Sequence, residues 1–392
     1  MVKTIYFDAA GKVHSLYKEM ISNPPEGYKF VGDSPAFNSL TNSIIKSPFI
    51  YDFQEEILSK FIPVNLFKAL IEKKKHLPRG ISFTYSPGHV IFRDEPWIMD
   101  LEFVTQMTGY SIDHLKRYKT IIENKLSSNN CKKIICWTEA CKKTILNSLN
   151  TTNFKDKIEV VPLAVKKKDF IKIFNKDQKI KILFVGSINI PGEFEYKGGK
   201  EVILAYKKLK KNYPNIQLII RSDLPDYLKD ECKKIEDITI YDNVLPWQKL
   251  ESEFINAQIF WFPTYATPGL AILDAMSYEL PVIATDVWAN SEMVREGETG
   301  FLIEKSNKIK YYDENFIPIW DYKSNSSFMK SIIIPDRDII NNLIDKTIIL
   351  LEDEKLRKKM GKKARYEIES GKFSIELRNK KLKEIFDYTA LN

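Results

Sequence analysis

Residues 264–303 read TYATPGLAILDAMSYELPVIATDVWANSEMVREGETGFLI. Gly269 begins a predicted helix after a strand and a loop, and Asp274 lies five residues into that helix. Backbone N–H groups at such a helix start favour an anion, and a carboxylate there can accept hydrogen bonds from a pair of sugar hydroxyls. Pro281–Asp286 predicts a strand that ends in a polar loop, and Gly297 opens a turn before a last apolar run. This order predicts one repeat of a parallel α/β sheet with a polar edge.

Strand and helix patterns alternate along the rest of the chain, which indicates two parallel sheets flanked by helices. In the first half the predicted strands are Lys3–Phe7, Tyr28–Val31, Ile81–Tyr85, Trp97–Leu101, Lys133–Trp137 and Ile158–Pro162. In the second half they are Ile180–Val185, Gln217–Ile220, Ile238–Tyr241, Ile259–Phe262 and Pro281–Ala284. Most of the polar, lysine-rich stretch Lys166–Lys181 predicts a linker. The segment Lys305–Ile334 interrupts the alternation of strand and helix patterns, which indicates an insertion.

Length, charge and hydropathy bound the class of protein. The chain has 392 residues, which predicts two domains. Its 60 lysines and arginines exceed its 52 aspartates and glutamates by 8. This small positive net charge is compatible with a protein that binds phosphates or an anionic surface. Nucleic acid is not expected, because no basic stripe is interleaved with exposed aromatic residues. No apolar run approaches the roughly 18 residues of a membrane helix, and no signal peptide is evident, so we expect a cytoplasmic protein and leave contact with the inner face of the membrane open.

The stretch at 264–303 resembles the donor-binding segment of family-4 retaining glycosyltransferases with the GT-B fold (glycosyl transferases group 1). The positions that match in register are Gly269, Asp274-Ala275-Met276, Pro281–Thr285, Glu292-Met293-Val294, Gly297 and Thr299-Gly300. A second match, Phe184–Gly199, resembles the strand, turn and Lys-Gly element of that family. The weaker matches are Lys157–Val165 and Ile134–Ala140. The resemblance therefore covers the second half well and the first half loosely.

The resemblance implies an α/β, GT-B-like fold in which two doubly wound, Rossmann-like domains face a central cleft. We expect an N-terminal acceptor-binding domain over 1–165, a linker over 166–179 and a nucleotide-sugar-binding domain over 180–370. The last helix, 371–392, is expected to pack back toward the first domain. In such sheets ligands bind at the carboxyl ends of the strands.

The implied activity is transfer of a sugar from a nucleotide-sugar donor to a hydroxyl of a glycan, lipid or other acceptor, with retention of configuration. No cofactor is expected, and the sequence names neither the sugar, the base nor the acceptor. The alternative is a non-catalytic homologue that acts as a binding or partner subunit. A nucleotide-sugar epimerase of the same fold is a further rival, against which the 274–300 pattern argues.

The family pattern implies a set of donor-binding residues in the second half. These are Lys197, Gly198, Gly269, Leu270, Asp274 and Glu292. The lysine would stabilise charge on the leaving phosphate, and the aspartate, one methylene shorter than the family's glutamate, would hold the donor ribose. The alternatives are a solvated loop lysine for Lys197, an exposed helix acid for Asp274 and a helix cap for Glu292.

Two positions depart from the family pattern. Ala266 stands where the family has its first glutamate, and Ser187 stands where an arginine usually follows the first strand of this half. Arg221, at the end of a neighbouring predicted strand, is the candidate that supplies the missing cation. The alternative is that Arg221 pairs with a local acid, Asp223 or Asp226.

Candidates for the catalytic groups lie in the first half. Glu102 follows the strand after which the family usually places a histidine, and Asp100 shares its strand face if the strand continues. His89 lies in a loop just beyond another strand and is the best imidazole candidate among four histidines. The alternatives are a carboxylate paired with a basic residue for Glu102 and a purely structural histidine for His89.

The sequence predicts no metal site. Its only Asp-x-Asp, at residues 336–338, follows a proline at a predicted helix start, where capping and the helix dipole favour acids. Cys131, Cys136 and Cys141 are spaced by five and match neither a zinc knuckle nor a redox pair, so we predict buried thiols.

Two basic helical stretches bear on membrane contact. Glu55–Lys75 combines apolar residues with a run of lysines, and the predicted helix Ile112–Leu126 carries further basic residues. Such a helix can lie on an anionic membrane. The other interpretation is a helix packed on the sheet with a solvated basic face.

Overall fold

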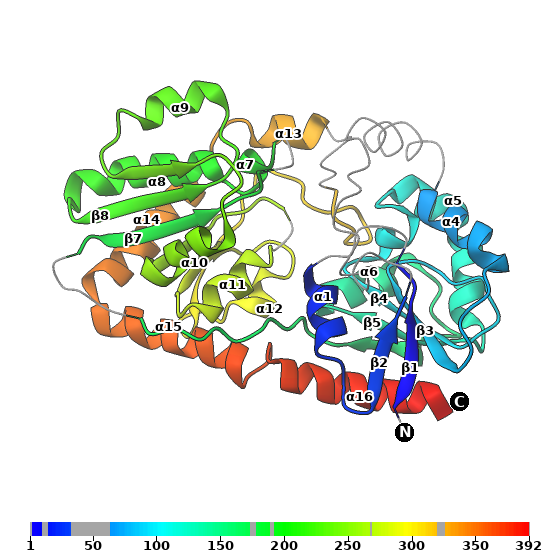
Figure 1. The fold of residues 1–392 in the computed structure, drawn as a ribbon. Coiled ribbons are helices and arrows are strands. Elements are labelled where there is room, and N and C mark those ends of the chain that lie inside the picture. The colour runs from blue at the N-terminus through cyan, green and yellow to red at the C-terminus, as the bar shows by residue number, and fades with distance from the viewer. Residues whose placement is uncertain are drawn as a thin grey trace. The chain divides into compact units, whose positions relative to one another are not determined.

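The computed structural model describes residues 2–9, 15–32, 63–172, 178–188, 192–266, 269–319 and 326–391. The chain forms two units, each with its own sheet (Figure 1). Unit 1 comprises Met1–Ala164, Tyr312–Ile317 and Ile375–Asn392, and unit 2 comprises Val165–Tyr311 and Pro318–Ser374. A short segment of the predicted insertion therefore belongs to unit 1, as does the C-terminal helix.

The sheet of unit 1 has six parallel strands in the order β2-β1-β3-β4-β5-β6. The strands are β1 (Lys3–Phe7), β2 (Tyr28–Val31), β3 (Ile81–Pro87), β4 (Trp97–Leu101), β5 (Cys131–Cys136) and β6 (Ile158–Val160). The helices are α1 (Ser15–Ser22), α4 (Val64–Ile71), α5 (Ile112–Ser127), α6 (Glu139–Ser148) and α16 (Ile375–Leu391). Short 3-10 turns are η2 (Glu72–Lys74), η3 (Val104–Thr108) and η4 (Lys155–Lys157).

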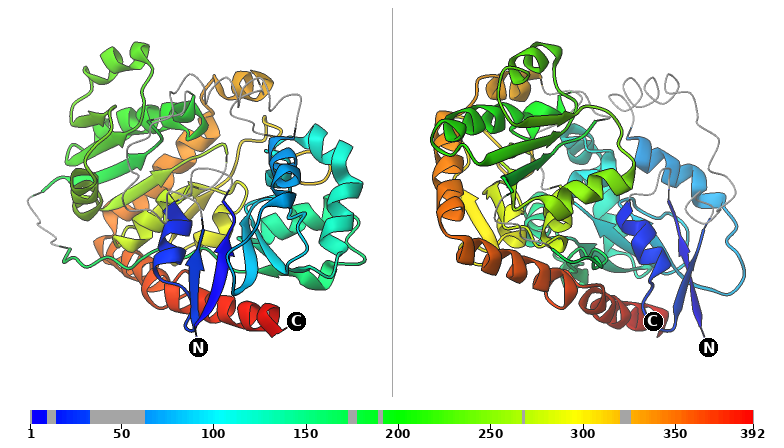
Figure 2. Two further views of the ribbon diagram at one scale, coloured as in Figure 1. Left: turned by 45° about the vertical axis from the view of Figure 1, so that its right-hand side comes forward. Right: turned by 60° about the vertical axis from the view of Figure 1, so that its left-hand side comes forward.

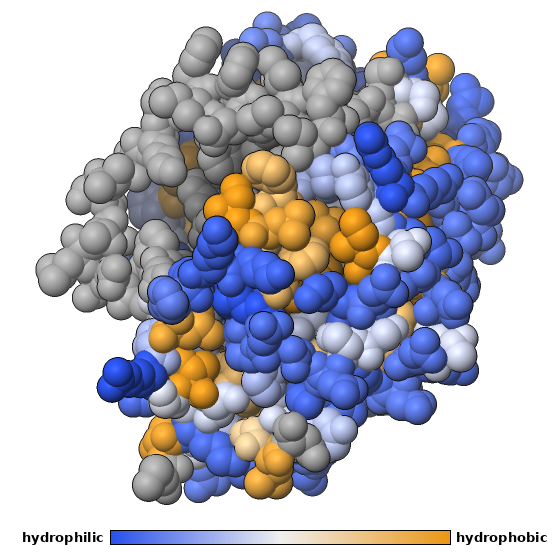
Figure 3. All heavy atoms as spheres, turned by 90° about the vertical axis from the view of Figure 1, so that its right-hand side faces the viewer, coloured by the Kyte–Doolittle hydropathy of each residue, from blue (hydrophilic) through white to orange (hydrophobic). Residues whose placement is uncertain are grey.

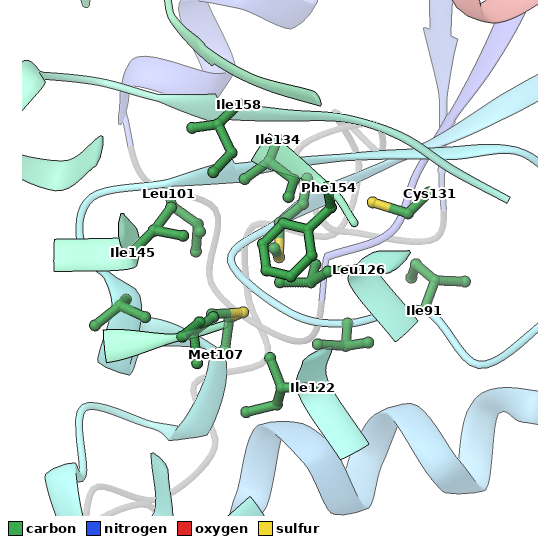
Figure 4. Close-up of a cluster of buried hydrophobic side chains, with 14 of the residues drawn as sticks. Ile91, Leu101, Met107, Ile122, Leu126, Cys131, Ile134, Ile145, Phe154 and Ile158 are labelled. Atoms are coloured by element: carbon green, nitrogen blue, oxygen red, sulfur yellow. The ribbon is translucent and has the colours of Figure 1, made fainter. Parts of the chain in front are cut away.

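Successive strand residues of unit 1 point to opposite faces of the sheet, so that a hydrophobic core forms on each face. Trp97, Met99 and Leu101 of β4 point into a cluster with α4, α5 and α6 (Figure 4), whereas Ile98 points into the opposite cluster with α1 and α16. Ile317, from the segment 312–317, is buried in the first cluster. Helix α16 closes the other face, as two further views show (Figure 2).

The sheet of unit 2 has six parallel strands in the order β12-β11-β10-β7-β8-β9. The strands are β7 (Ile180–Val185), β8 (Ile216–Arg221), β9 (Ile238–Tyr241), β10 (Ile259–Phe262), β11 (Val282–Thr285) and β12 (Gly300–Ile303). The longer helices are α8 (Gly199–Asn212), α10 (Trp247–Asn256), α14 (Arg337–Glu352) and α15 (Glu354–Glu369). The shorter helices are α7 (Glu193–Tyr196), α9 (Asp226–Cys232), α11 (Ala271–Ser277), α12 (Asn290–Met293) and α13 (Ser326–Ile332).

Buried aromatic residues join this second sheet to helices on both faces. The indole of Trp261 in β10 donates to Thr347 Oγ1 of α14 at 2.9 Å. Its neighbour Phe260 points the other way and stacks on Phe254 of α10. All four residues of β10 are buried, as expected for a central strand of a parallel sheet that is covered on both faces.

Each sheet has a point where the strand order reverses. In unit 1 this switch point lies between β1 and β3, and in unit 2 it lies between β7 and β10. Open α/β sheets bind ligands in the crevice outside the carboxyl ends of the strands at such a point. The fold therefore directs attention to the residues that follow β1, β3, β7 and β10.

The structure tests several of the sequence predictions directly. The parallel α/β fold is confirmed, and Asp336 caps α14 through the N–H of Asp338, as predicted for that acid pair. The four cysteines are free and buried, as predicted. Strand β4 ends at Leu101, so the premise that it continues to Glu102 is wrong.

The described part of the predicted helix Glu55–Lys75 is α4 followed by η2, and residues 55–62 lie outside the described ranges. Leu66 and Ala69 of α4 pack into the core, while Phe67, Leu70 and Ile71 are about half exposed or more. In the view of Figure 3, apolar side chains gather into patches on a largely hydrophilic surface. None of the described helices is both long and apolar enough to cross a membrane.

Candidate functional site

The turn after β7 is held against the end of β8. The Gly186 N–H donates to the Arg221 carbonyl at 2.7 Å, and Ser222 Oγ donates to the Ser187 carbonyl at 3.2 Å. The N–H of Asp223 donates to the same Ser187 carbonyl at 3.0 Å. These bonds place Arg221 beside the turn that carries Ser187, the residue at which the family arginine is missing.

Arg221 is half-buried at the carboxyl end of β8. Its Nη1 donates to the Gly186 carbonyl at 2.8 Å, and its buried Nε has no hydrogen-bond partner among the described residues. Burial lowers the pKa of this guanidinium, and no acidic neighbour in the described chain offsets that effect. The nearby acid Asp226 pairs with Lys229 at 3.1 Å instead. Arg221 thus offers an incompletely satisfied cation next to the switch point.

Lys197 lies in a short turn between α7 and α8. The turn depends on Gly198, whose φ of 75° is left-handed and whose added Cβ would lie 2.1 Å from the Pro263 carbonyl oxygen. The N–H of Tyr265 donates to the Tyr196 carbonyl at 2.8 Å, which ties the same turn to the segment after β10. The switch-point strand β10 therefore positions the lysine turn.

The ring of Phe262 brings two predicted site positions together. The buried Lys197 ammonium lies 5.2 Å from the centroid of this ring and 4.0 Å from Glu193 Oε2. A Cβ added to Gly269 would lie 3.1 Å from the Phe262 ring. Lys197 and Gly269 thus flank one aromatic side chain at the end of β10, and Leu270 follows as the N-cap residue of α11.

Asp274 lies in the first turn of α11. Burial raises the pKa of its carboxyl group to about 6, and the Lys168 ammonium opposes that rise. Lys168 lies over the rings of Trp247, at 4.9 Å, and Tyr278, at 5.5 Å. Asp274 therefore belongs to a cluster with one cation and two aromatic rings, of which Trp247 is about half exposed.

Glu292 lies on the short helix α12, beyond the end of β11. Its carbonyl accepts a hydrogen bond from Lys372 Nζ at 2.8 Å. The end of β11 is joined to the segment after β10, because Thr285 Oγ1 donates to the Thr264 carbonyl. The place of Glu292 in the donor set stays a prediction.

His89 lies at the corresponding switch point of unit 1. It follows β3, and its Nε2 lies 4.0 Å from Oδ1 of Asp8, which follows β1. The Arg93 guanidinium donates to Asp8 Oδ2 and, at 2.7 Å, to Glu95 Oε1. Although burial would raise the pKa of Asp8, the nearby His89 and the hydrogen bond and charge of Arg93 hold it below its usual range. Burial, and then the Asp8 carboxylate, raise the pKa of Glu72.

Glu102 is half-buried just after β4, and its backbone N–H donates to Gln106 Oε1 at 2.8 Å. Gln106 also packs against the turn after β3, because a Cβ on Gly88 (φ 88°) would lie 2.3 Å from its side-chain nitrogen. Gln106 therefore links the turn before His89 to the residue after β4. The catalytic roles of His89 and Glu102 remain predictions.

Asp100 does not face this edge as a free carboxylate. Its Oδ1 accepts from Tyr17 at 2.5 Å and from the Trp137 indole at 2.7 Å, and its Oδ2 accepts from Tyr85 at 2.6 Å. Burial raises the pKa of Asp100 to about 6, against the lowering effect of these three bonds. The adjoining cavity of about 30 Å³ has room for one or two waters. Asp100 is thus the centre of a structural network.

Several residues at these crevices lack an obvious local motif. Sequence reasoning missed Phe262 in unit 2, which lies beside Lys197. It also missed Asp8, Glu72 and Arg93 in unit 1, which strand order and helix packing bring close to His89. One available signal was that Asp8 directly follows the first predicted strand. A charged residue at that position marks the carboxyl edge of a parallel sheet.

Comparison with known proteins agrees with this architecture. Residues 179–314 match the family model described as Glycosyl transferases group 1. Two curated relatives match: an uncharacterized 41.2 kDa protein in the cps region of Klebsiella pneumoniae, 28% identical over 186 residues, and the capsular polysaccharide biosynthesis glycosyltransferase CapM of Staphylococcus aureus, 25% identical over 195 residues. The alignments cover 44% and 49% of this chain and 49% and 43% of the relatives, so the chain spans about half the length of the curated relatives it matches.

Solved structures establish the fold. Sucrose-phosphate synthase of Thermosynechococcus elongatus aligns with a TM-score of 0.62 at 14% identity, covering 99% of this chain and 98% of the other. HepE of Anabaena in complex with UDP and glucose aligns with a TM-score of 0.56 at 11% identity, covering 99% and 100%. TarM of S. aureus aligns with a TM-score of 0.56 at 19% identity, covering 81% and 57%. The chain therefore has the GT-B fold, and residues 179–314 within it are similar to glycosyl transferases group 1.

Proposed function

We propose that this chain transfers a sugar from a nucleotide-sugar donor to a hydroxyl of a glycan, lipid or other acceptor, with retention of configuration. The observation that carries the proposal is a pair of cations at the carboxyl edge of the unit 2 sheet. The half-buried Arg221 ends β8 beside the turn after β7, and the buried Lys197 lies beside Phe262 at the end of β10, inside the region that matches the glycosyl transferases group 1 model.

The proposed chemistry explains why cations are needed there. As the glycosidic bond to the donor phosphate breaks, negative charge grows on the leaving nucleoside diphosphate. A preorganised cation in a partly dehydrated site stabilises that charge without having to reorganise. The Nε of Arg221 has no hydrogen-bond partner among the described residues, and Lys197 is buried beside a phenyl ring, so both meet this description. Removal of one such group is expected to cost on the order of 100- to 1000-fold in rate.

The nucleoside part of the donor has a candidate region around Asp274. We assign the ribose hydroxyls to the Asp274 carboxylate, with the exposed ring of Trp247 and Lys168 nearby. HepE was solved with UDP and glucose, and TarM was solved with UDP and α-GlcNAc-glycerol. Uridine diphosphate is therefore the first nucleotide to test with this chain.

The acceptor is assigned to unit 1, with His89 and Glu102 as candidate catalytic groups at the carboxyl edge of its sheet. The relative CapM bears a name from capsular polysaccharide biosynthesis, which supports a glycan or lipid-linked glycan as the acceptor. The alternative function, a non-catalytic binding subunit, is motivated by Ser187 and by Ala266, which is fully buried and carries no carboxylate.

The test combines donor binding with turnover. Thermal unfolding is measured with a panel of nucleoside diphosphates and their sugars for the native chain, for Lys197→Ala and for Lys207→Ala, an exposed lysine of α8 that serves as the control. A ligand at about a hundredfold excess over its Kd stabilises the native state by about 2.7 kcal/mol. We expect one nucleotide to raise the Tm of the native chain and of the control, and to raise it much less in Lys197→Ala.

Turnover distinguishes the two candidate functions. Release of nucleoside diphosphate from the donor, dependent on an added acceptor, is expected for the enzyme. Donor binding without release across a broad acceptor panel would favour the binding subunit. The absence of a shift with any nucleotide at millimolar concentration would contradict the donor site itself.

A further inference from the structure

We propose that Asp8, Glu72 and His89 of unit 1 bind a divalent transition-metal ion. One ligand atom from each of the three side chains lies within 4.8 Å of the other two. Asp8 and His89 are almost fully buried, and Glu72 is half-buried. No other group of three such side chains comes together in the part of the chain that the structure describes. All three residues belong to unit 1, whereas the residues of the proposed donor site belong to unit 2.

The first argument is an unsatisfied nitrogen. His89 is 3% exposed, and its Nε2 has no hydrogen-bond partner among the described residues. An imidazole nitrogen that is buried without a partner is costly. Its nearest charged neighbour, Asp8 Oδ1, is 4.0 Å away, too far for a hydrogen bond. A metal ion between the nitrogen and the carboxylate would satisfy both.

The second argument is the orientation of the ligands. Arg93 donates to Asp8 Oδ2, which leaves Oδ1 as the oxygen that faces His89. The backbone of His89 is held by Ser86, whose Oγ donates to the His89 carbonyl and accepts from its N–H. Residues such as Arg93 and Ser86, which hold a ligand residue by hydrogen bonds without touching the ion, orient metal ligands and are common around metal sites.

The third argument concerns charge and spacing. The carboxylates of Asp8 and Glu72 lie close together; Arg93 pairs with Asp8, and the charge of Lys75 acts on Glu72. Ligands about 2.1 Å from an ion lie roughly 3.0–3.4 Å from one another. The cluster must therefore contract by about 1 Å, which a bound cation would promote by removing the repulsion between the carboxylates.

The ligand set selects the class of metal. One imidazole and two carboxylates suit Zn²⁺ or Mn²⁺, whereas Mg²⁺ and Ca²⁺ prefer oxygen alone. Three protein ligands leave coordination positions for water or for a ligand oxygen. Asp8 follows β1 and His89 follows β3, so the site occupies the switch point of unit 1, where α/β sheets bind ligands.

Metal binding is tested directly, without reference to sugar transfer. The full chain is stripped with chelator and dialysed against Zn²⁺ or Mn²⁺, and bound metal is measured by elemental analysis and titration calorimetry. We expect one ion per chain, weaker binding of Mg²⁺, and nitrogen coupling in the EPR spectrum of the Mn²⁺ form. His89→Ala and Glu72→Gln should each weaken binding by at least 10- to 100-fold.

The control is His114→Ala. His114 is also buried with a ring nitrogen, Nδ1, that has no partner among the described residues, but it belongs to no such cluster. The His114→Ala variant should bind metal as the native chain does. Circular dichroism checks that each variant folds, and Glu72→Gln keeps the test decisive if His89→Ala does not fold. Binding unchanged in Glu72→Gln, or no stoichiometric binding by the native chain, would overturn the proposal.

Discussion

The strand ends at the two switch points share one architecture and differ in the charge of the side chains that follow them. In unit 2 Arg221 ends β8, and Lys197 and Gly269 flank Phe262 at the end of β10. In unit 1 the groups that meet after β1 and β3 include Asp8 and His89, with Glu72 beside them. The fold therefore decides where ligands can meet side chains, and the residues at the strand ends decide whether that place suits an anion or a cation.

The two units also differ in how their cores are completed. Unit 2 is built from residues 165–311 and 318–374, whereas unit 1 needs two short late segments, 312–317 and 375–392. Ile317 enters one core of unit 1, and Phe386 enters the other. The stability of unit 1 therefore depends on segments far away in the sequence, and the predictions below probe this difference and the contrast between the strand ends.

The largest expected effect comes from Gly198→Val. The left-handed backbone of Gly198 and the contact of a Cβ with the Pro263 carbonyl oxygen, at 2.1 Å, leave no room for a side chain. We expect a loss of about 4 kcal/mol or more in the free energy of unfolding, because strain and a backbone clash add. Gly27→Val in unit 1 shares the positive φ but meets open space among the described residues, so it should cost only about 1–2 kcal/mol. Urea unfolding measures both, and equal losses would show that the lysine turn is not tightly packed.

Ile317→Ala tests the late segment. Ile317 is 1% exposed in the core of unit 1, so its truncation should cost about 3 kcal/mol. Hydrogen exchange followed by mass spectrometry should show faster exchange in peptides of unit 1 and unchanged exchange in unit 2. Ile333→Ala, from the same predicted insertion but half exposed in unit 2, should change stability by less than about 0.5 kcal/mol. Loosening of unit 2 instead would contradict the assignment of 312–317 to unit 1.

Asp274 and Asp100 provide a pH comparison. Burial raises the pKa of each from 3.8 to about 6, so the folded state binds a proton that the unfolded state has released between about pH 4 and pH 6. Each group therefore contributes stability that is present at low pH and is lost as pH rises through about 6, at most about 3 kcal/mol. Asp274→Asn should reduce this loss of stability with rising pH, and at pH 8 the substitution should leave the free energy of unfolding unchanged or increase it.

Asp100→Asn should behave differently, because three donors face the carboxylate. The amide oxygen can take the place of Oδ1 and keep the bonds from Tyr17 and Trp137, but the amide nitrogen then faces the Tyr85 hydroxyl, which can no longer donate there. We therefore expect a loss of about 1–3 kcal/mol at pH 8. Urea unfolding at pH 4.5 and pH 8 measures both variants. Similar behaviour of the two variants at pH 8 would mean that the hydrogen bonds to Asp100 do not matter.

The smallest expected effect comes from Tyr28→Phe. The Tyr28 hydroxyl donates to Asp387 of α16 at 2.7 Å. Its loss should cost about 1 kcal/mol and should be seen in unit 1. Tyr366→Phe, at an exposed position of α15, is the control and should be neutral. An unchanged midpoint for Tyr28→Phe would indicate that this hydrogen bond does not help to hold α16 on unit 1.

Local patterns predicted much of the fold. The strands Lys3–Phe7, Ile180–Val185 and Ile259–Phe262 were located from apolar runs alone, because a strand covered on both faces is continuously apolar. Boundaries are harder to predict: α14 and α15 follow each other directly and are separate helices only because Asp353 ends one and caps the other. Such a break depends on cap geometry that apolar periodicity does not report.

The candidate sites were predicted unevenly. Lys197, Gly198 and Gly269 were named through the resemblance to a family pattern, which can be recognised because it lies within short segments. The cluster of Asp8, Glu72 and His89 was missed, and the sequence was interpreted as metal-free. Its members lie far apart in the chain and share no motif, so only the order of β1 and β3 and the packing of η2 bring them together.

The sequence by itself determined the alternation of strands and helices, the division into two halves and the segment that carries the glycosyl transferases group 1 pattern. These properties follow from hydropathy and turn chemistry over a few residues. The tertiary structure alone decided that Ile317 belongs to unit 1, that Asp100 is satisfied within the core and that Arg221 lies beside Ser187. The physical reason is that burial and charge pairing depend on contacts between distant segments, which no local pattern encodes.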